Sequence, residues 1–402
     1  MSAASSLVEL GQQCLPVQNE AVNPDVQDQC QTAYMFTATP ATVHCNCDIQ
    51  GPTINTTESA TQTLYDNYLL GSKIENIILK NELGKPKDAH TPKKPTYGTL
   101  SLEEIKGNDK KMKYFTGLTY VQFMALFSFL GDSVNDLKYW SSKTPTKSTI
   151  KEKRKIPPVE QLFITLVRLR RGFGLETMSH LLRVSESYIS TIFCTWIQFM
   201  YNHFNELRHQ MFPDRHHFTH FMPKVFKTFK NIRCSIDCTE FFVQMPRDFG
   251  RQGNMYSSYK HHHTYKCLIA TAPNGATVYV SDLFEGSISD RNIVEKSGFL
   301  SYLNPGDLIL ADRGFTIEDM LMSRQVSLNI PPFLGKRTHL TPRENVKTRR
   351  IAKARIHVER VIERVKKFQL ISGIIPLSLS PMLNQLVFVC SCLVNFQKPI
   401  VT

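Results

Sequence analysis

A chain of 402 residues has room for two or three domains. Its hydrophobic content of 42%, with 10% aromatic residues, is ample for packed cores and excludes a wholly disordered protein. The formal charge of +13 is unevenly spread, since residues 1–72 contain no Lys or Arg, so a polyanionic partner is expected only where the basic residues gather.

The cysteines indicate a reducing compartment. Ten of them stand at irregular spacings, several inside apolar runs where Cys behaves as a small hydrophobic residue. No basic segment followed by an apolar core, as in a secretory signal, precedes them, so we expect free thiols in the cytosol or nucleus. Cys45 and Cys47 beside His44 form half of a zinc pattern, and no second ligand pair completes it.

The first two predicted segments carry little chemistry. Residues 1–62 are rich in Ser, Thr, Gln, Asn and Pro and show no sustained period, which predicts a disordered N-terminal segment. Residues 63–112 are predicted to hold a short amphipathic helix, with Leu70, Ile74, Ile77 and Ile78 on one face, and then a linker.

Residues 113–205 are helical throughout and are predicted to form a helix-turn-helix domain. An apolar helix covers residues 121–130, and Pro158 opens another at its first position. A helix ending near Arg183 is followed by Ser185, which is well placed to cap a second helix that could enter a major groove. A purely structural bundle is the alternative.

Residues 206–402 change period and predict an α/β domain. Strands are expected at 232–244, 266–272, 277–284, 307–312 and 326–330, and helices from Ser289, at 316–324 and at 348–368. Asn274-Gly275 is a strong hairpin signal between the second and third strands. This order is that of a ribonuclease H-like fold with a mixed five-stranded sheet. The apolar run 386–396 is too short for a membrane span and predicts a buried terminal helix in a soluble chain.

Three carboxylates are the candidate active-site residues. Asp237 and Asp312 each close a short apolar run that predicts a buried strand, and the fold would place those strands side by side, while Glu359 lies on a basic helix. An all-oxygen site suits two Mg²⁺ or Mn²⁺ ions, which can activate water and stabilise a leaving oxygen in phosphodiester cleavage. Glu240 and Glu363 compete for the third position. Asp290 is better explained as a first-turn acid of its helix.

Basic residues surround these acids in the sequence. Residues 336–367 contain twelve Lys or Arg against three Glu, which favours polyanion contact over a merely solvated helix. His261-His262-His263, together with Lys260 and several nearby aromatic residues, fits a loop for phosphate contact and base stacking. Zinc binding and a structural role are the alternatives for this loop.

Seven phrases carry a family resemblance, and they occur in one order along the chain: Tyr259-Lys-His-His-His-Thr-Tyr-Lys266, Pro273-Asn-Gly275, Gly286-Ser-Ile-Ser-Asp290, Pro305-Gly-Asp307, Ala311-Asp-Arg-Gly-Phe315, Ile330-Pro-Pro-Phe333 and Val358-Glu-Arg360. In these seven phrases, the stretch from about residue 114 to 396 resembles the Harbinger-type transposases, which are DDE superfamily endonucleases. Arg355, Glu359 and Lys366 also reproduce the spacing around the catalytic Glu of bacterial insertion-sequence relatives, although Ala352 stands where those relatives carry Tyr.

The resemblance implies a catalytic and metal-binding triad of Asp237, Asp312 and Glu359, two Mg²⁺ or Mn²⁺ ions as cofactors, and double-stranded DNA as substrate. The residues expected to contact DNA are basic or imidazole side chains: Arg355, Lys366, Arg313, His262, Lys260 and Arg350. Animal relatives carry an N-terminal THAP zinc module, which is not recognisable here.

Two functions follow as hypotheses. The first is a metal-dependent DNA endonuclease of the transposase type, in the nucleus, with Lys151–Lys155 as a candidate import signal. The second is a host-adopted descendant that binds DNA or a protein and no longer cuts. A homodimer or higher oligomer and a helper DNA-binding protein are further expected partners, and no membrane is expected.

Overall fold

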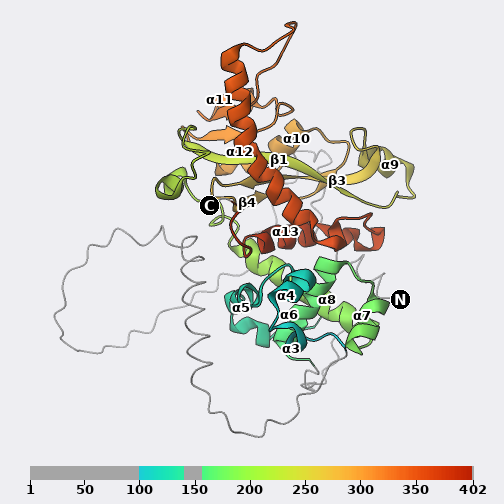
Figure 1. Ribbon diagram of the computed structural model, residues 1–402. Helices are drawn as coiled ribbons and strands as arrows, with labels where there is room; N and C mark the ends of the chain where they lie inside the picture. The colour runs from blue at the N-terminus through green and yellow to red at the C-terminus, as the bar shows by residue number, and fades with distance from the viewer. Residues whose placement is uncertain (1–98, 140–155, 401–402) are drawn as a thin grey trace, which may run out of the picture.

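The computed structural model describes residues 99–139 and 156–400. Figure 1 shows a layer of helices below a sheet, with one long helix running along the sheet and beyond it. The predicted disordered segment, the helix from Leu70, the partial zinc pattern at His44 and the basic run Lys151–Lys155 lie outside the described residues.

The helical layer contains α3 (Leu102–Ile105), α4 (Asp109–Thr116), α5 (Tyr120–Phe129), η1 (Asp132–Asn135), α6 (Pro158–Arg171), α7 (Leu175–Leu182) and α8 (Glu186–Glu206). The predicted helices of this region are present. A capping box between Thr119 and Gln122 begins α5, and Pro158 occupies the first position of α6. Two short helices, α3 and α4, lie where a polar stretch was predicted, because Ser101 and Asn108 cap segments too short to display a period.

The predicted helix-turn-helix is formed by α7 and α8. Arg183 ends α7 in the left-handed conformation at φ 54°, and Ser185 is the N-cap residue of α8 without bonding through its side chain. Ile189, Ile192 and Phe193 face the core as predicted, and the helix then continues to Glu206. Its C-terminal half is buried beneath α13 (Leu383–Val394).

A mixed sheet forms the second layer and confirms the predicted ribonuclease H-like α/β fold. Its strands are β1 (Ile232–Phe242), β2 (Tyr256–Ser257), β3 (His262–Thr271), β4 (Thr277–Val280), β5 (Phe284–Glu285), β6 (Leu308–Leu310) and β7 (Ser327–Asn329). β3 runs antiparallel to β1 and β4, whereas β6 is parallel to both β1 and β7. The β3–β4 turn contains Gly275, whose φ of 85° requires a residue tolerant of the left-handed region.

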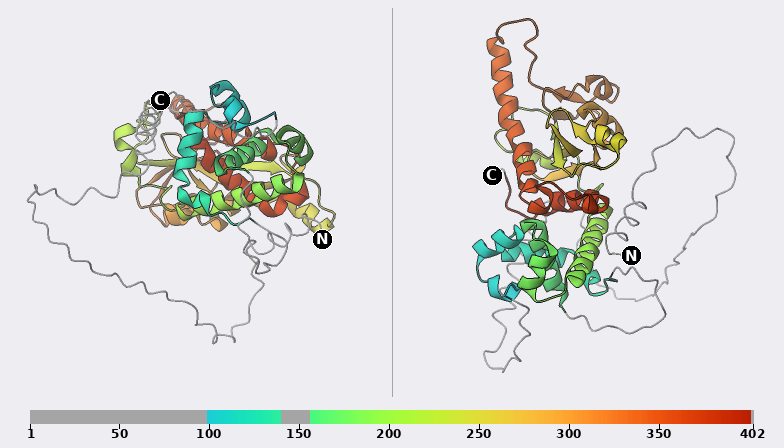
Figure 2. Two further views of the ribbon diagram at one scale, coloured as in Figure 1. Left: turned by 90° about the horizontal axis from the view of Figure 1, so that it is seen from below. Right: turned by 90° about the vertical axis from the view of Figure 1, so that its right-hand side faces the viewer.

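Helices cover both faces of the sheet: α10 (Asp290–Lys296) and α11 (Glu318–Met322) on one, and α12 (Pro342–Lys366) on the other (Figure 2). The alternation along β1 explains this arrangement. Ile236 packs in the cluster that contains residues of α10 and α11, whereas Phe241 packs with Val358 and Val361 of α12. The remaining short helices are α9 (Phe249–Met255), η2 (Arg215–Phe221), η3 (Phe299–Tyr302), η4 (Gln369–Ile371) and η5 (Leu377–Met382).

Helix α12 begins at Pro342, whereas the sequence predicted a start at Thr348. Thr341 and Glu344 form a capping box, and Arg337 donates two hydrogen bonds of 2.9 Å to the Glu344 carboxylate. The first buried residue of the helix is Ile351. The first two turns therefore bury no apolar side chain, so no hydrophobic period marked them in the sequence.

One hydrophobic core joins the helical layer to the sheet across the predicted domain boundary at residue 205. Trp196 of α8, Leu386 of α13 and Val361 of α12 belong to the same cluster of buried residues. By length and composition, the helical stretch Leu377–Val394 could cross a membrane, but 67% of it is buried inside the fold. Its role here is that of a core helix, as predicted for the terminal apolar run.

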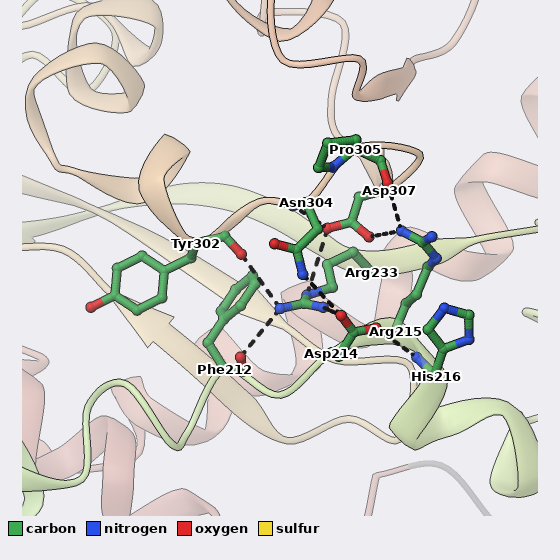
Figure 3. A network of polar contacts seen from close by, with 9 residues as sticks. All are labelled: Phe212, Asp214, Arg215, His216, Arg233, Tyr302, Asn304, Pro305 and Asp307. Atoms are coloured by element: carbon green, nitrogen blue, oxygen red, sulfur yellow. Dashed lines mark hydrogen bonds and ion pairs between the residues drawn. The ribbon is translucent and has the colours of Figure 1, made fainter.

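A buried ion network ties the segment after α8 to the sheet (Figure 3). The Asp307 carboxylate is fully buried, accepts a 2.7 Å hydrogen bond from Arg215 and lies 3.9 Å from Nε of Arg233. Arg233, on β1, is itself only 4% exposed and also approaches Asp214. Burial lowers the pKa of Arg233 while the Asp307 charge raises it, so the Asp307 carboxylate offsets part of the cost of burying the Arg233 charge.

We expect Asp307→Asn to destabilise the fold by about 3–5 kcal/mol, because it leaves Arg233 charged and buried without the buried carboxylate beside it. Urea unfolding followed by circular dichroism measures the change. Asp319→Asn is the control, since Asp319 forms an exposed pair with Arg291 and such pairs contribute little. Equal losses in the two variants would contradict this account of the buried network.

Candidate active site

The parallel pairing of β1 with β6 brings two predicted acids together. Ser235 pairs with Leu310, so two residues further along each chain Asp237 and Asp312 stand level with each other. Asp237 lies within β1, and Asp312 follows β6 directly. Odd-numbered residues of β1 such as Phe241 pack toward α12, so Asp237 points toward the same helix.

The third acid reaches this point from α12 through Arg355. One Arg355 nitrogen lies 3.1 Å from Oδ1 of Asp312, and the other lies 3.7 Å from Oε1 of Glu359, one turn along the helix. Arg355 is held in place by burial, with 11% of its side chain exposed. Both partner carboxylates are half exposed, at 54% and 55%. The guanidinium is therefore fixed while the acids keep one side open to solvent.

Asp237 is the most perturbed of the three acids. Its pKa is raised to about 6, mainly by burial and to a smaller extent by the Asp312 and Glu359 charges, while Arg355 and a 3.0 Å hydrogen bond from the Cys238 amide act in the opposite direction. These mutual effects place all three acids and Arg355 within electrostatic range of one another. The structure thus brings together the three acids that the sequence singled out.

The donor set fits a hard divalent cation in kind. All three groups offer carboxylate oxygens, which Mg²⁺ and Mn²⁺ prefer. Within residues 99–139 and 156–400, however, no three His, Cys, Asp or Glu side chains are close enough to hold one ion together. Arg355 accounts for this spacing, because its guanidinium stands between Asp312 and Glu359 and supplies part of the positive charge.

The predicted DNA-contacting residues fall into two groups. Lys366 lies over the Phe241 ring at 5.8 Å, and burial followed by the nearby Lys260 charge lowers its pKa. Lys260, 4.3 Å from the Tyr259 ring, and His262, beside Phe242, extend this group along the start of β3.

The second group lies further along the exposed surface. Arg313 follows Asp312 and lies 5.9 Å from the Phe333 ring. Arg350 is exposed on α12, about two and a half turns before Glu359. The structure therefore places Arg355, Lys366 and Arg313 near the acids, Lys260 near Lys366, and Arg350 at a distance from the acids.

The competing acids have other partners. Glu240 is buried, accepts a 2.8 Å hydrogen bond from Thr264 and lies 3.8 Å from Lys266. Asp290, at the start of α10, lies 3.1 Å from the same lysine. Glu363 pairs with Lys367 at 2.8 Å. None of them joins the group around Arg355.

Comparison with protein families agrees with this geometry. Residues 236–395 match the DDE superfamily endonuclease family, and residues 154–206 match the helix-turn-helix of DDE superfamily endonucleases. The chain belongs to the DDE superfamily of endonucleases. No curated protein and no solved structure matched it.

The helix-turn-helix of this DDE endonuclease relative indicates DNA binding, but its second helix has an unusual surface. Helix α8 contains no Lys or Arg, and Trp196, Met200 and Phe204 bury its C-terminal half. The exposed face of the helix is polar, with Ser187 and Thr191 in the first turns and Gln198, Asn202 and Asn205 further along. Lys or Arg contacts to phosphate would therefore come from other segments of the chain.

Sequence reasoning missed two features of the site. The first is the position of Arg355 between the acids, since its spacing predicted only a DNA contact. The second is the segment 215–236, which contains five Lys or Arg and no acid, a signal that was available in the sequence. Part of that segment packs against α12 and extends the basic surface away from the acids.

The pKa of Asp237 predicts a pH-dependent stability. Because its pKa is raised from 3.8 to about 6, the Asp237 carboxyl binds its proton more tightly in the folded than in the unfolded chain. Its contribution to the stability of the wild-type protein is therefore lost as pH rises through about 6. Asp237→Asn has no charge to bury. We expect its stability relative to wild type to rise by about 1–3 kcal/mol between acidic and mildly alkaline pH in metal-free buffer.

Denaturant unfolding across this pH range measures the difference. Asp319→Asn is the control, because this carboxylate is exposed and its pair with Arg291 should contribute little to stability at any pH in the range. A stability difference for Asp237→Asn that does not change with pH would contradict the assigned burial and repulsion at this carboxylate.

Proposed function

We propose that this protein is a divalent-metal-dependent DNA endonuclease of the transposase type. The observation that supports the proposal most strongly is the meeting of Asp237, Asp312 and Glu359 around one buried guanidinium. These acids come from positions far apart in the chain, and repulsion between them opposes their approach. An arrangement that concentrates like charge in this way is typical of a site built to bind cations.

The roles of the residues follow from their exposure. Asp312 and Glu359 present oxygens to solvent, and Asp237 lies deeper, so each of the three would contribute carboxylate oxygens to the divalent ions. When bound, such ions activate a water or hydroxyl and stabilise the leaving oxygen of a phosphodiester.

Cations around the acids would hold the DNA. Arg355 and Lys366 lie on the same helix as Glu359, and Lys260 lies near Lys366. They would neutralise phosphates next to the scissile bond, which predicts binding that weakens steeply with salt. Arg313 and His262 would add contacts at the edges of this surface.

Further details are part of the same proposal. The seven matching phrases support a Harbinger-type enzyme that transfers strands as well as cutting them. A DNA substrate would require a nuclear location, and assembly as a homodimer or with a helper DNA-binding protein would bring two DNA ends together.

Purified protein should nick supercoiled DNA in Mg²⁺ or Mn²⁺. Asp312→Asn should lower the nicking rate by more than about 100-fold, since even groups that only support a metal ligand contribute about 10–100-fold. Binding to the same DNA should persist, because the basic residues remain. Gel electrophoresis measures nicking, and fluorescence anisotropy measures binding.

Glu363→Gln is the matched control, because Glu363 lies one turn beyond Glu359 on the same helix and pairs with Lys367. We expect it to nick DNA at the wild-type rate. Nicking that survives Asp312→Asn would show that the activity arises elsewhere.

One observation favours the second candidate, a DNA-binding descendant that no longer cuts. Arg355 already neutralises Asp312 and Glu359, and no three acids of the described residues form a metal cluster. DNA binding by the wild-type protein without nicking in either metal would decide for this function.

A further inference from the structure

A groove lies at the projecting end of α12, away from the three acids. It encloses about 530 Å³ between the first turns of α12, the turn segment at Thr228 and Phe229, and the end of β7 at Asn329. The α12 side contributes Pro342, Arg343, Val346, Lys347 and Arg350. Three of these side chains are cations, and the other lining groups are apolar or uncharged.

The opposite wall is a built element with its own pattern. Residues 223–230 form successive turns in which Phe226 and Phe229 are buried, while Lys224, Lys227 and Lys230 are exposed. The two Phe residues pack with Ile351 and Ala354 of α12, so the wall is fixed to the helix. A period of three residues thus places aromatic anchors inward and lysines outward.

The charge of the groove is not balanced by acids. Three cations line it, namely Arg343, Lys347 and Arg350, and the turn segment that forms the opposite wall carries three exposed lysines, Lys224, Lys227 and Lys230. The acid nearest in sequence, Glu344, is already bonded to Arg337, and the other ion pairs of α12 in the described part of the chain involve Arg355 and Lys367. Such a surface attracts a polyanion.

The first turns of α12, which line this groove, are not packed into the core. Residues 342–350 bury no side chain, and the capping box and the Arg337 pair hold their start. A polar helix that projects from the fold in this way is expected where it contacts a partner. Figure 1 shows α12 continuing past the edge of the sheet toward this end.

We propose that this groove binds the phosphate backbone of duplex DNA at a distance from the cleavage point. The inference rests on the proposed function, because it takes the acids as the place where the strand is cut. Arg350 and Arg343 precede Glu359 by 9 and 16 residues, or about 14 and 24 Å along the helix. A duplex advances about 3.4 Å per base pair, so the groove would hold phosphates about four to seven base pairs away.

The test is the salt dependence of binding to a fluorescent duplex, measured without divalent metal so that no cutting occurs. The groove variant is the triple Arg343→Gln, Lys347→Gln, Arg350→Gln. Each lost phosphate contact lowers the slope of log affinity against log salt by about 0.9, so the groove variant should lose about 2–3 units of slope. The exchange Arg343→Lys, Lys347→Arg, Arg350→Lys should retain the wild-type slope.

The matched control is Lys336→Gln, Arg349→Gln, Lys353→Gln, which removes the same charge from exposed positions outside the groove lining. We expect it to change the slope by less than about one unit. Equal losses of slope in the two triple variants would overturn the proposal that the groove binds DNA, because the overall positive charge of the surface would then explain the binding. A groove triple that alters only the molecular mass by light scattering would overturn it in favour of a second copy.

The failure of the proposed function has a different signature. If wild-type protein binds no duplex at low salt, both proposals fall. If wild-type protein binds and nicks DNA in an Asp312-dependent manner, but the groove triple keeps the full slope, only the groove is wrong. Circular dichroism of each triple confirms that the exposed substitutions leave the fold unchanged.

Discussion

Three carboxylates repel one another beside the inner strands β1 and β6 of the sheet, and Arg355 is the cation that allows them to approach. Its guanidinium contacts Asp312 and Glu359 and acts on Asp237 through space. Because Arg355 is almost fully buried, it cannot leave the site by simple rotation into solvent. The arrangement of β1, β6 and α12 brings these four charged side chains close to one another, and this is its main contribution to the site.

The rest of the fold holds these four side chains in position. The parallel β1–β6 pair sets the two Asp residues level, and the apolar face of α12 against β1 fixes Glu359 above them. Helix α13 continues the same core into the helical layer, so the helix-turn-helix is joined to the sheet through buried side chains. Since α8 contains no Lys or Arg and is half buried, exposed cations near the sheet lie on α12 and on the segment before β1, and our proposal assigns phosphate contacts to them.

Much of this was predictable, and the exceptions have physical reasons. The β3–β4 hairpin at Gly275 and the capped start of α10 at Ser289 follow from local chemistry. The start of α12 was placed six residues late, because its first turns bury nothing and show no period. The three acids could be named from their positions at strand ends and on the basic helix. The insertion of Arg355 between them depends on side-chain packing, which no spacing rule expresses.

Mn²⁺ binding measured by titration calorimetry tests the central claim most directly, because it asks whether the three acids act as one cation site. We expect wild-type protein at mildly alkaline pH to bind Mn²⁺ with an affinity that falls sharply when Asp312 or Glu359 is replaced by its amide. Replacing Glu363 by Gln should leave the affinity unchanged. Equal Mn²⁺ binding by wild-type protein and by a variant lacking all three acids would contradict the account.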